Sequence, residues 1–286
     1  MSIQSSAQSV LWRLLAARSQ GPDETFWRQK AVVFAPHQDD ETLGCGGTVL
    51  AKKAKAAHVS IVFMTDGRLS HAGLISEADL IARRADEALA ACHALNVAAE
   101  DVYFLNIPDG RVTQQKDTAV PQIVKLLSNL RPEQIFVPYR HEPPPDHYST
   151  THAVLAALEQ IGQPVEVYEY PVWAWYHWPW VGLGSSALGD RRAILKNTAT
   201  MLFGLRLFAD LRLSVDINDL VGQKRAALAE HQSQMSRLLP DTRWLTLADV
   251  SDGEWLDCFF RGKELFHHYS FSGNGPTPPT PGDAAI

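Results

Sequence analysis

The chain has 286 residues, of which 45% are hydrophobic and 20% charged, and its formal net charge is −6. This length and balance suit one large domain with a buried core, and the lack of a basic excess argues against a nucleic-acid partner. Three widely separated cysteines suggest neither a disulfide framework nor a thiolate zinc knuckle. The sequence shows neither a signal-peptide core nor an apolar run long enough to span a bilayer, which predicts a cytoplasmic location.

Short apolar runs alternate with longer amphipathic stretches along the chain. An amphipathic helix is expected first, at residues 8–18. Four strand–helix repeats and a fifth strand then follow, with strands at 31–36, 59–64, 102–105, 134–137 and 165–170 and helices at 42–57, 77–95, 120–130 and 148–161. Residues 199–213 are read as a strand pair or an amphipathic segment, and 221–236 as a helix. The alternation predicts an α/β fold, a Rossmann-like and mainly parallel sheet with helices on both faces.

Residues 1–272 are expected to form a single domain, with a core at roughly 30–236, an N-terminal helix and a C-terminal extension. The Pro-, Gly- and Thr-rich residues 273–286 predict a disordered tail. The segment 173–180 is dense in Trp, Tyr and Pro. A cap over the core is the favoured reading for it, and a sugar-stacking or partner surface is the alternative.

Polar clusters follow four of the predicted strands. His37 to Glu41 follow the first strand, Asp66 to Ser70 the second, Asp109 the third, and Asp146 with His147 the fourth. Because the carboxyl ends of parallel strands meet at one edge of a sheet, these groups are expected to gather there. The active site is therefore predicted at the C-terminal ends of the strands.

The cluster after the first strand has the composition of a metal site. One imidazole and three carboxylates within a single turn are costly to bury unless a cation or a proton balances them. A hydrolytic zinc ion takes three protein ligands and keeps one open position. His37 and Asp40 can supply two ligands and His147 a third, which leaves Asp39 as a base beside the metal. A simpler reading, that Asp39 or Asp40 caps the following helix, explains only one carboxylate.

Several segments resemble one enzyme family. Residues 32–47, VVFAPHQDDETLGCGG, resemble the signature of the PIG-L/LmbE-type zinc-dependent de-N-acetylases, A-H-P-D-D-E before a Gly-rich helix start. Further matches follow in order, at Arg84–Glu87, at Phe104–Gly110, at 138–147 (PYRHEPPPDH) and at Lys224–Gln234. Together they cover roughly residues 30–235, which makes chance an unsatisfactory explanation.

The resemblance implies a role for each matching residue. It makes His37, Asp40 and His147 the zinc ligands and Asp39 the general base, while Asp146 would orient a neighbouring histidine. Fe²⁺ or another divalent ion could take the place of zinc in such a site.

The resemblance also implies a substrate site, with one departure from the family pattern. Arg84 and Asp109 match positions that bind the sugar in related enzymes. Pro144 stands where the family usually has a histidine that stabilises the oxyanion or protonates the leaving amine. His141, on the same loop, is the favoured replacement, and Arg140 or a residue of the Trp-rich segment is another candidate. Arg140 is also expected to bind the substrate.

The implied function is a zinc-dependent hydrolase that removes the acetyl group from an N-acetylated, GlcNAc-type sugar. Its partner would be a small-molecule sugar or sugar conjugate, and a homo-oligomer is left open. One alternative is a zinc amidase that acts on another N-acyl or a thiol-sugar conjugate. Another is a non-catalytic metal- or sugar-binding homologue, which Pro144 makes plausible. A dinucleotide-binding protein is discounted, because Gly44–Gly47 do not form a G-x-G-x-x-G motif.

Two further histidines are read as structural. His152 follows His147 by five residues and is expected to point away from the face of His147 on their shared helix. His231 is expected to anchor its helix beneath the site.

Overall fold

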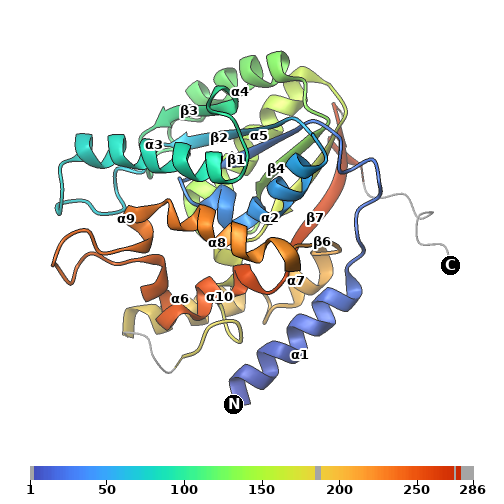
Figure 1. Ribbon diagram of the computed structural model, residues 1–286. Helices are drawn as coiled ribbons and strands as arrows, with labels where there is room; N and C mark the ends of the chain where they lie inside the picture. Colours follow the sequence, from blue (N-terminus) through green and yellow to red (C-terminus); the bar gives the residue numbers. More distant parts are fainter. Residues whose placement is uncertain (1–2, 184–187, 274, 278–286) are drawn as a thin grey trace.

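A mainly parallel sheet forms the centre of the computed structural model, which describes residues 3–183, 188–273 and 275–277 (Figure 1). Its eight strands are β1 Ala31–Ala35, β2 Val59–Thr65, β3 Val102–Ile107, β4 Gln134–Pro138, β5 Val165–Tyr170, β6 Leu213–Asp216, β7 Lys263–Ser272 and β8 Gly275–Thr277. They are ordered β3-β2-β1-β4-β5-β7-β6, with β8 paired to β7. β1 to β5 run parallel, and β7 runs antiparallel to β5, β6 and β8. The predicted α/β fold class is thereby confirmed.

Ten α-helices surround this sheet in the described part of the chain. They are α1 Ile3–Arg18, α2 Asp40–Ala54, α3 Glu77–Ala94, α4 Lys116–Leu130, α5 Pro145–Ile161, α6 Leu188–Thr200, α7 Leu205–Asp210, α8 Val221–Ala229, α9 Gln232–Met235 and α10 Glu254–Asp257. Short 3₁₀ turns lie at Ala99–Asp101, Trp173–Trp175, Asn218–Leu220, Leu247–Gly253 and Cys258–Phe260. None of the described helices is long and apolar enough to cross a membrane.

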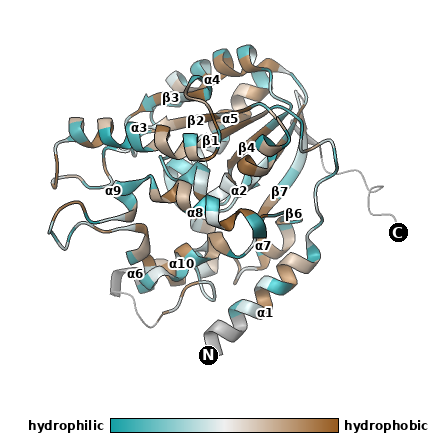
Figure 2. Cartoon of the chain, in the orientation of Figure 1, coloured by the Kyte–Doolittle hydropathy of each residue, from teal (hydrophilic) through white to brown (hydrophobic). Residues whose placement is uncertain are grey.

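The strands are buried on both faces because alternate side chains feed two separate cores. On β1, Val33 belongs to the core beneath α2, whereas Val32 and Phe34 belong to the core beneath α4 and α5. This period of two inside a continuously apolar run is the pattern of a parallel sheet covered on both faces. Figure 2 shows the result as brown strands at the centre of the molecule.

The chain after β5 departs from the predicted pattern. The expected helix at 221–236 is divided into α8 and α9, which meet at His231. Residues 199–213 form the end of α6 and the short helix α7, so the amphipathic reading holds and the strand pair is wrong.

The residues beyond the predicted core complete the sheet. β7 lies between β5 and β6, so β6 joins the sheet only through β7. Gly275–Thr277, at the start of the tail predicted to be disordered, pair with β7 as β8. Residues 274 and 278–286 of that tail lie outside the described residues.

Candidate metal and active site

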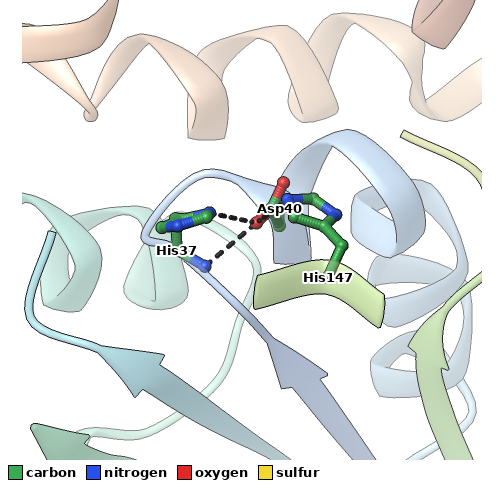
Figure 3. Close-up of side chains that lie close together, drawn as sticks. All are labelled: His37, Asp40 and His147. Atoms are coloured by element: carbon green, nitrogen blue, oxygen red, sulfur yellow. Dashed lines mark hydrogen bonds and ion pairs between the residues drawn. The ribbon is translucent and has the colours of Figure 1, made fainter. Parts of the chain in front are cut away.

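The polar groups predicted to gather at the carboxyl edge of the sheet do meet there. Residues 36–39 connect β1 to α2, and His147 lies in the first turn of α5. Figure 3 shows the three predicted ligands converging from these two places. Asp40 Oδ2 lies 3.3 Å from His37 Nδ1 and 3.3 Å from His147 Nε2. The backbone N–H of His37 donates to the same oxygen at 2.9 Å, which fixes the Asp40 carboxylate toward both rings.

The donor set of these three residues fits a metal ion. Their ligand atoms lie within 4.8 Å of one another, and two imidazole nitrogens with one carboxylate oxygen are a zinc-type set. His147 is fully buried, and neither of its ring nitrogens has a hydrogen-bond partner. Buried polar atoms normally have partners, so this ring has a coordination capacity that the protein itself does not use.

The electrostatics favour His147 and Asp40 as ligands. At His37, burial lowers the pKa, but hydrogen bonds to Asp109, Asp146 and Asp40 outweigh it and raise the pKa well above its usual value, so a metal ion there has to displace a proton. Burial lowers the pKa of His147 to about 4, so its ring is neutral near pH 7, as a metal ligand must be. Burial alone would raise the pKa of Asp40, but the two histidines outweigh it and hold the pKa below its usual value. Asp40 is therefore ionised and His147 neutral before any metal arrives.

A second group that could hold a metal shares His37 and contains Asp109 and Asp146. Its oxygens are already engaged. Asp146 accepts the backbone N–H groups of Gly110 at 2.7 Å and Val112 at 3.2 Å, and Asp109 accepts that of Leu69 at 3.2 Å. His37 Nε2 lies 3.2 Å from Asp109 Oδ1 and 3.8 Å from Asp146 Oδ2. These carboxylates thus orient the His37 ring from behind, leaving Nδ1 to face Asp40.

Asp39 lies beside the triad in an unusual backbone conformation. Its φ of 148° is one that side-chain-bearing residues rarely adopt. It occupies the N-cap position of α2 but makes no capping hydrogen bond with its side chain. Arg84 Nη2 instead lies 3.3 Å from Asp39 Oδ2, and burial raises the pKa of Asp39 to about 7. The carboxylate that sequence analysis assigned as the base is thus separate from the ligand and free of a helix-capping role.

A cavity of about 310 Å³ opens over these residues. The predicted site residues Asp39, Arg84 and Asp109 line it. Most of the remaining lining residues are apolar, namely Leu43, Leu69, Pro144, Trp173, Leu247 and Trp255. The others carry hydrogen-bonding groups, namely His37, Asp40, Ser70 and Gln234. This mixture is typical of a small-ligand site. A larger depression of about 630 Å³ lies outside α3 and contains neither metal-compatible group found in the described residues.

Four predicted site residues are not among those lining this cavity. Asp146 and His147 contact the lining residues His37 and Asp40, whereas Arg140 and His141 contact other groups. Arg140 holds the buried Glu169 at 2.7 Å, and the His141 ring lies 5.3 Å from that of Tyr139. Neither residue is among those lining the cavity, whereas Pro144 is. The position where the resemblance expects a histidine therefore does face the cavity, but the favoured replacement does not.

Glu142 is a residue whose importance the sequence analysis did not recognise. It accepts the backbone N–H groups of Val172, Trp173 and Ala174 at 2.6–2.9 Å, and its Oε2 lies 3.5 Å from His147 Nδ1. One carboxylate thus joins a metal-ligand candidate to the Trp-rich segment. The available signal was its place in the matched segment, where the family pattern also has an acid.

The Trp-rich segment is mostly packing. Trp175 and Trp180 are buried, and Trp12 on α1 lies against both of them. Trp173 stacks on Trp255 with ring centroids 4.7 Å apart, and both line the cavity. The favoured reading, a cap over the core, describes most of the segment, and Trp173 alone gives it a surface for stacking a ligand.

His231 and His152 lie as predicted. His231 Nε2 contacts Glu41 Oε1 at 2.8 Å, and the other oxygen of Glu41 accepts the backbone N–H of Asp39 at 2.9 Å. His231 therefore anchors the α8–α9 junction to the loop that carries Asp39. His152 is exposed and lies against Tyr148.

Comparison with known proteins places this site in a family. The family model described as "PIG-L: GlcNAc-PI de-N-acetylase" matches residues 32–158, which contain all three candidate ligands and Asp39. Residues 32–158 belong to the PIG-L family. A diacetylchitobiose deacetylase from Thermococcus kodakarensis is 24% identical to this chain over 219 residues, 76% of this chain and 72% of that protein. The homology thus extends beyond the PIG-L segment itself.

Solved structures share the fold. The N,N'-diacetylchitobiose deacetylase from Pyrococcus horikoshii superimposes with a TM-score of 0.62, at 20% identity, over 96% of this chain and 94% of that one. The 4-carboxy-2-hydroxymuconate hydratase GalB from Pseudomonas putida does so with a TM-score of 0.53, at 16% identity, over 80% and 84%. Since a deacetylase and a hydratase share this fold, the fold alone does not fix the reaction.

Proposed function

We propose that this PIG-L relative is a zinc-dependent hydrolase that removes the acetyl group from an N-acetylated sugar or sugar conjugate. The observation that carries the proposal is the triad of buried Asp40 and His147 with partly exposed His37, beside a separate carboxylate, Asp39, that lines the cavity together with His37 and Asp40. The relationship to a diacetylchitobiose deacetylase supports the substrate class. A zinc ion bound by the triad would supply Lewis-acid polarisation of the amide carbonyl.

The chain's own residues would perform the remaining steps. Asp39 accepts a proton from the attacking water and returns it to the leaving amine, so that acetate and a free amino sugar result. Arg84, which lines the cavity next to Asp39, stabilises the negative charge that develops on the carbonyl oxygen. Its Nε is buried without a hydrogen-bond partner, so the protein itself does not use this donor.

Substrate binding would use the cavity walls. Asp109 lines the cavity, and a carboxylate oxygen that already accepts one hydrogen bond can accept a second, so Asp109 would accept a sugar hydroxyl. Trp173 offers an apolar surface on which a sugar ring can lie. A volume near 310 Å³ is at the small end of ligand sites, which favours one sugar unit inside with any further groups outside. A cytoplasmic location remains part of the proposal.

Two alternatives follow from the same site. The first is an amidase for another N-acyl or thiol-sugar conjugate, which would use the same residues. The second is a non-catalytic binding protein, which the presence of Pro144 on the cavity favours. The test combines metal analysis with acetate release from a panel of N-acetylated sugars and sugar lipids. Acetate release that requires metal and disappears in His147→Ala is the expected result. Release of a different acyl group would identify the amidase, and zinc binding without any turnover would contradict catalysis.

A further inference from the structure

Exposed apolar side chains gather on one part of the molecule. Among the described residues, eleven large hydrophobic side chains are exposed. Seven of them lie on α1, on residues 173–183, on α6 or on residues 201–210, and we call these four segments the apolar face. The seven are Val10, Leu14, Trp178, Leu195, Leu202, Phe203 and Leu205. Large contiguous apolar patches of this kind mark interaction surfaces rather than ordinary protein exterior.

The segments of the apolar face are packed together. Gln8 of α1 donates to the backbone carbonyls of Pro179 and Trp180, at 2.9 Å each. The backbone N–H of Trp178 in turn donates to Thr198 of α6 at 3.0 Å. Figure 1 shows α1, α6 and α7 along the lower part of the molecule, and Figure 2 shows brown turns on the outer helix α1. Hydrogen bonds therefore join α1, the Trp-rich segment and α6, which carry four of the seven exposed side chains between them.

The tip of this region is held out at a conformational cost. Leu202 and Phe203 have φ values of 48° and 55°, in the left-handed region that bulky residues avoid. The side chains of Phe203 and Leu205 are nevertheless 69% and 66% exposed. Gly or Asn would adopt this turn at a lower conformational cost. The large apolar side chains are therefore held in solvent at the expense of folding stability.

The charge of the apolar face is opposite to that of the whole protein. Residues 3–18, 173–183 and 188–210 together contain six Lys or Arg and two Asp, a net charge of +4, in a chain whose net charge is −6. Of these basic residues, Arg192 and Lys196 on α6 are exposed. Exposed Phe, Leu and Trp side chains on segments with a net positive charge are the composition of a region that lies in an anionic lipid interface.

We propose that the apolar face docks this protein on an anionic membrane surface, with Phe203 and Leu205 entering the interface and the basic residues facing lipid headgroups. Two copies meeting through this face would bring two charges of +4 together, which argues against a symmetric dimer. No described helix can span a bilayer, so the contact is peripheral. The proposal does not depend on the reaction that the site performs.

The test is co-sedimentation of the full chain with vesicles. Vesicles of phosphatidylcholine alone are compared with vesicles that contain about one-third phosphatidylserine, and binding to the anionic set is expected to be at least about tenfold stronger. The double variant Phe203→Ser/Leu205→Ser is expected to lose most of this binding. The matched control is Leu239→Ser/Leu245→Ser, which removes two exposed leucines elsewhere. Arg192→Glu/Lys196→Glu should remove the preference for phosphatidylserine.

Each contrary result would overturn the proposal. The absence of binding to either kind of vesicle would do so. An equal loss of vesicle binding in Phe203→Ser/Leu205→Ser and in Leu239→Ser/Leu245→Ser would also do so. A dimer in size-exclusion chromatography that Phe203→Ser/Leu205→Ser dissociates would assign the face to a second copy instead. An unchanged thermal unfolding temperature in each variant shows that a loss of vesicle binding does not come from a loss of folding. Acetate release in detergent-free buffer reports independently on the cavity.

Discussion

Two buried charged clusters lie along α2, and they differ in how fully their polar atoms are paired. At the N-terminus of the helix, the site cluster contains His37, Asp39, Asp40 and His147, with two unpartnered ring nitrogens and a strained Asp39. Two turns further on, Glu264 of β7 accepts the backbone N–H groups of Gly47 and Thr48, at 2.8 and 2.7 Å.

The same contrast holds for the buried cation of each cluster. Lys224 donates to Glu264 and to two backbone carbonyls, at 2.8–3.0 Å, whereas Arg84 at the site keeps its Nε unpartnered. A saturated cluster stabilises the fold, and an unsaturated one has capacity left for a ligand. Burial and charge alone would not have separated the two.

The largest expected effect comes from emptying the ligand set. His147→Ala should lose bound metal, measured as metal per chain after dialysis, and acetate release should fall to background. The control is His152→Ala on the same helix, whose exposed ring should be dispensable. Unchanged metal content in His147→Ala would remove this residue from the site.

Replacement of the base should separate chemistry from metal binding. Asp39→Asn is expected to keep the metal while acetate release falls about 10²–10⁴-fold, the usual contribution of a positioned acid–base group. Asp40→Asn, one residue away, should lose metal instead. Full turnover in Asp39→Asn would exclude Asp39 as the base.

The saturated cluster should show the opposite behaviour. Glu264→Gln leaves Lys224 as a buried charge without its carboxylate, which should cost about 3–5 kcal/mol in the free energy of unfolding. Urea titration measures this loss, and metal content and activity of the folded fraction should not change. A large loss of metal with normal stability would break the distinction between the two clusters.

Arg84 and His141 are the two candidates for stabilising the developing oxyanion, and substitution should separate them. Arg84→Met should lower acetate release by about 10²–10³-fold, as expected when one donor to a developing oxyanion is removed. His141→Ala, whose ring lies away from the cavity, should retain most activity. The reverse order of effects would restore His141 as the replacement for the missing histidine.

The smallest expected effect measures the conformational strain in the backbone at Asp39. Asp39→Gly and Asp39→Ala both remove the carboxylate, but only glycine adopts a φ of 148° without strain. The glycine variant should therefore be more stable than the alanine variant by about 1–3 kcal/mol in thermal or urea unfolding of the metal-free protein. Equal stabilities would show that the loop relaxes around the alanine.

Much of this architecture could be predicted from residue patterns because it rests on local periodicity. The strands at 31–36 and 165–170 and the helix at 77–95 coincide with β1, β5 and α3 to within a residue. The site edge follows from parallel topology, which brings His37 and His147 together despite their separation in sequence.

The remainder depends on contacts that local patterns do not encode. Nothing near Lys263 announces that β7 inserts antiparallel between β5 and β6. The direction of the His141 side chain depends on the exit geometry of β4, and the role of Glu142 on a segment thirty residues away.

The position of β7 has a consequence for the order of events during synthesis. β6 has no neighbour in the sheet, and Lys224 has no carboxylate partner, until residues 263–272 have left the ribosome. A nascent chain that ends between residues 224 and 263 thus carries an open sheet edge along β5 and an unbalanced cation next to α2. The full sheet can close only when this late segment arrives, so a nascent chain stalled before residue 263 should be a substrate for chaperones or proteases.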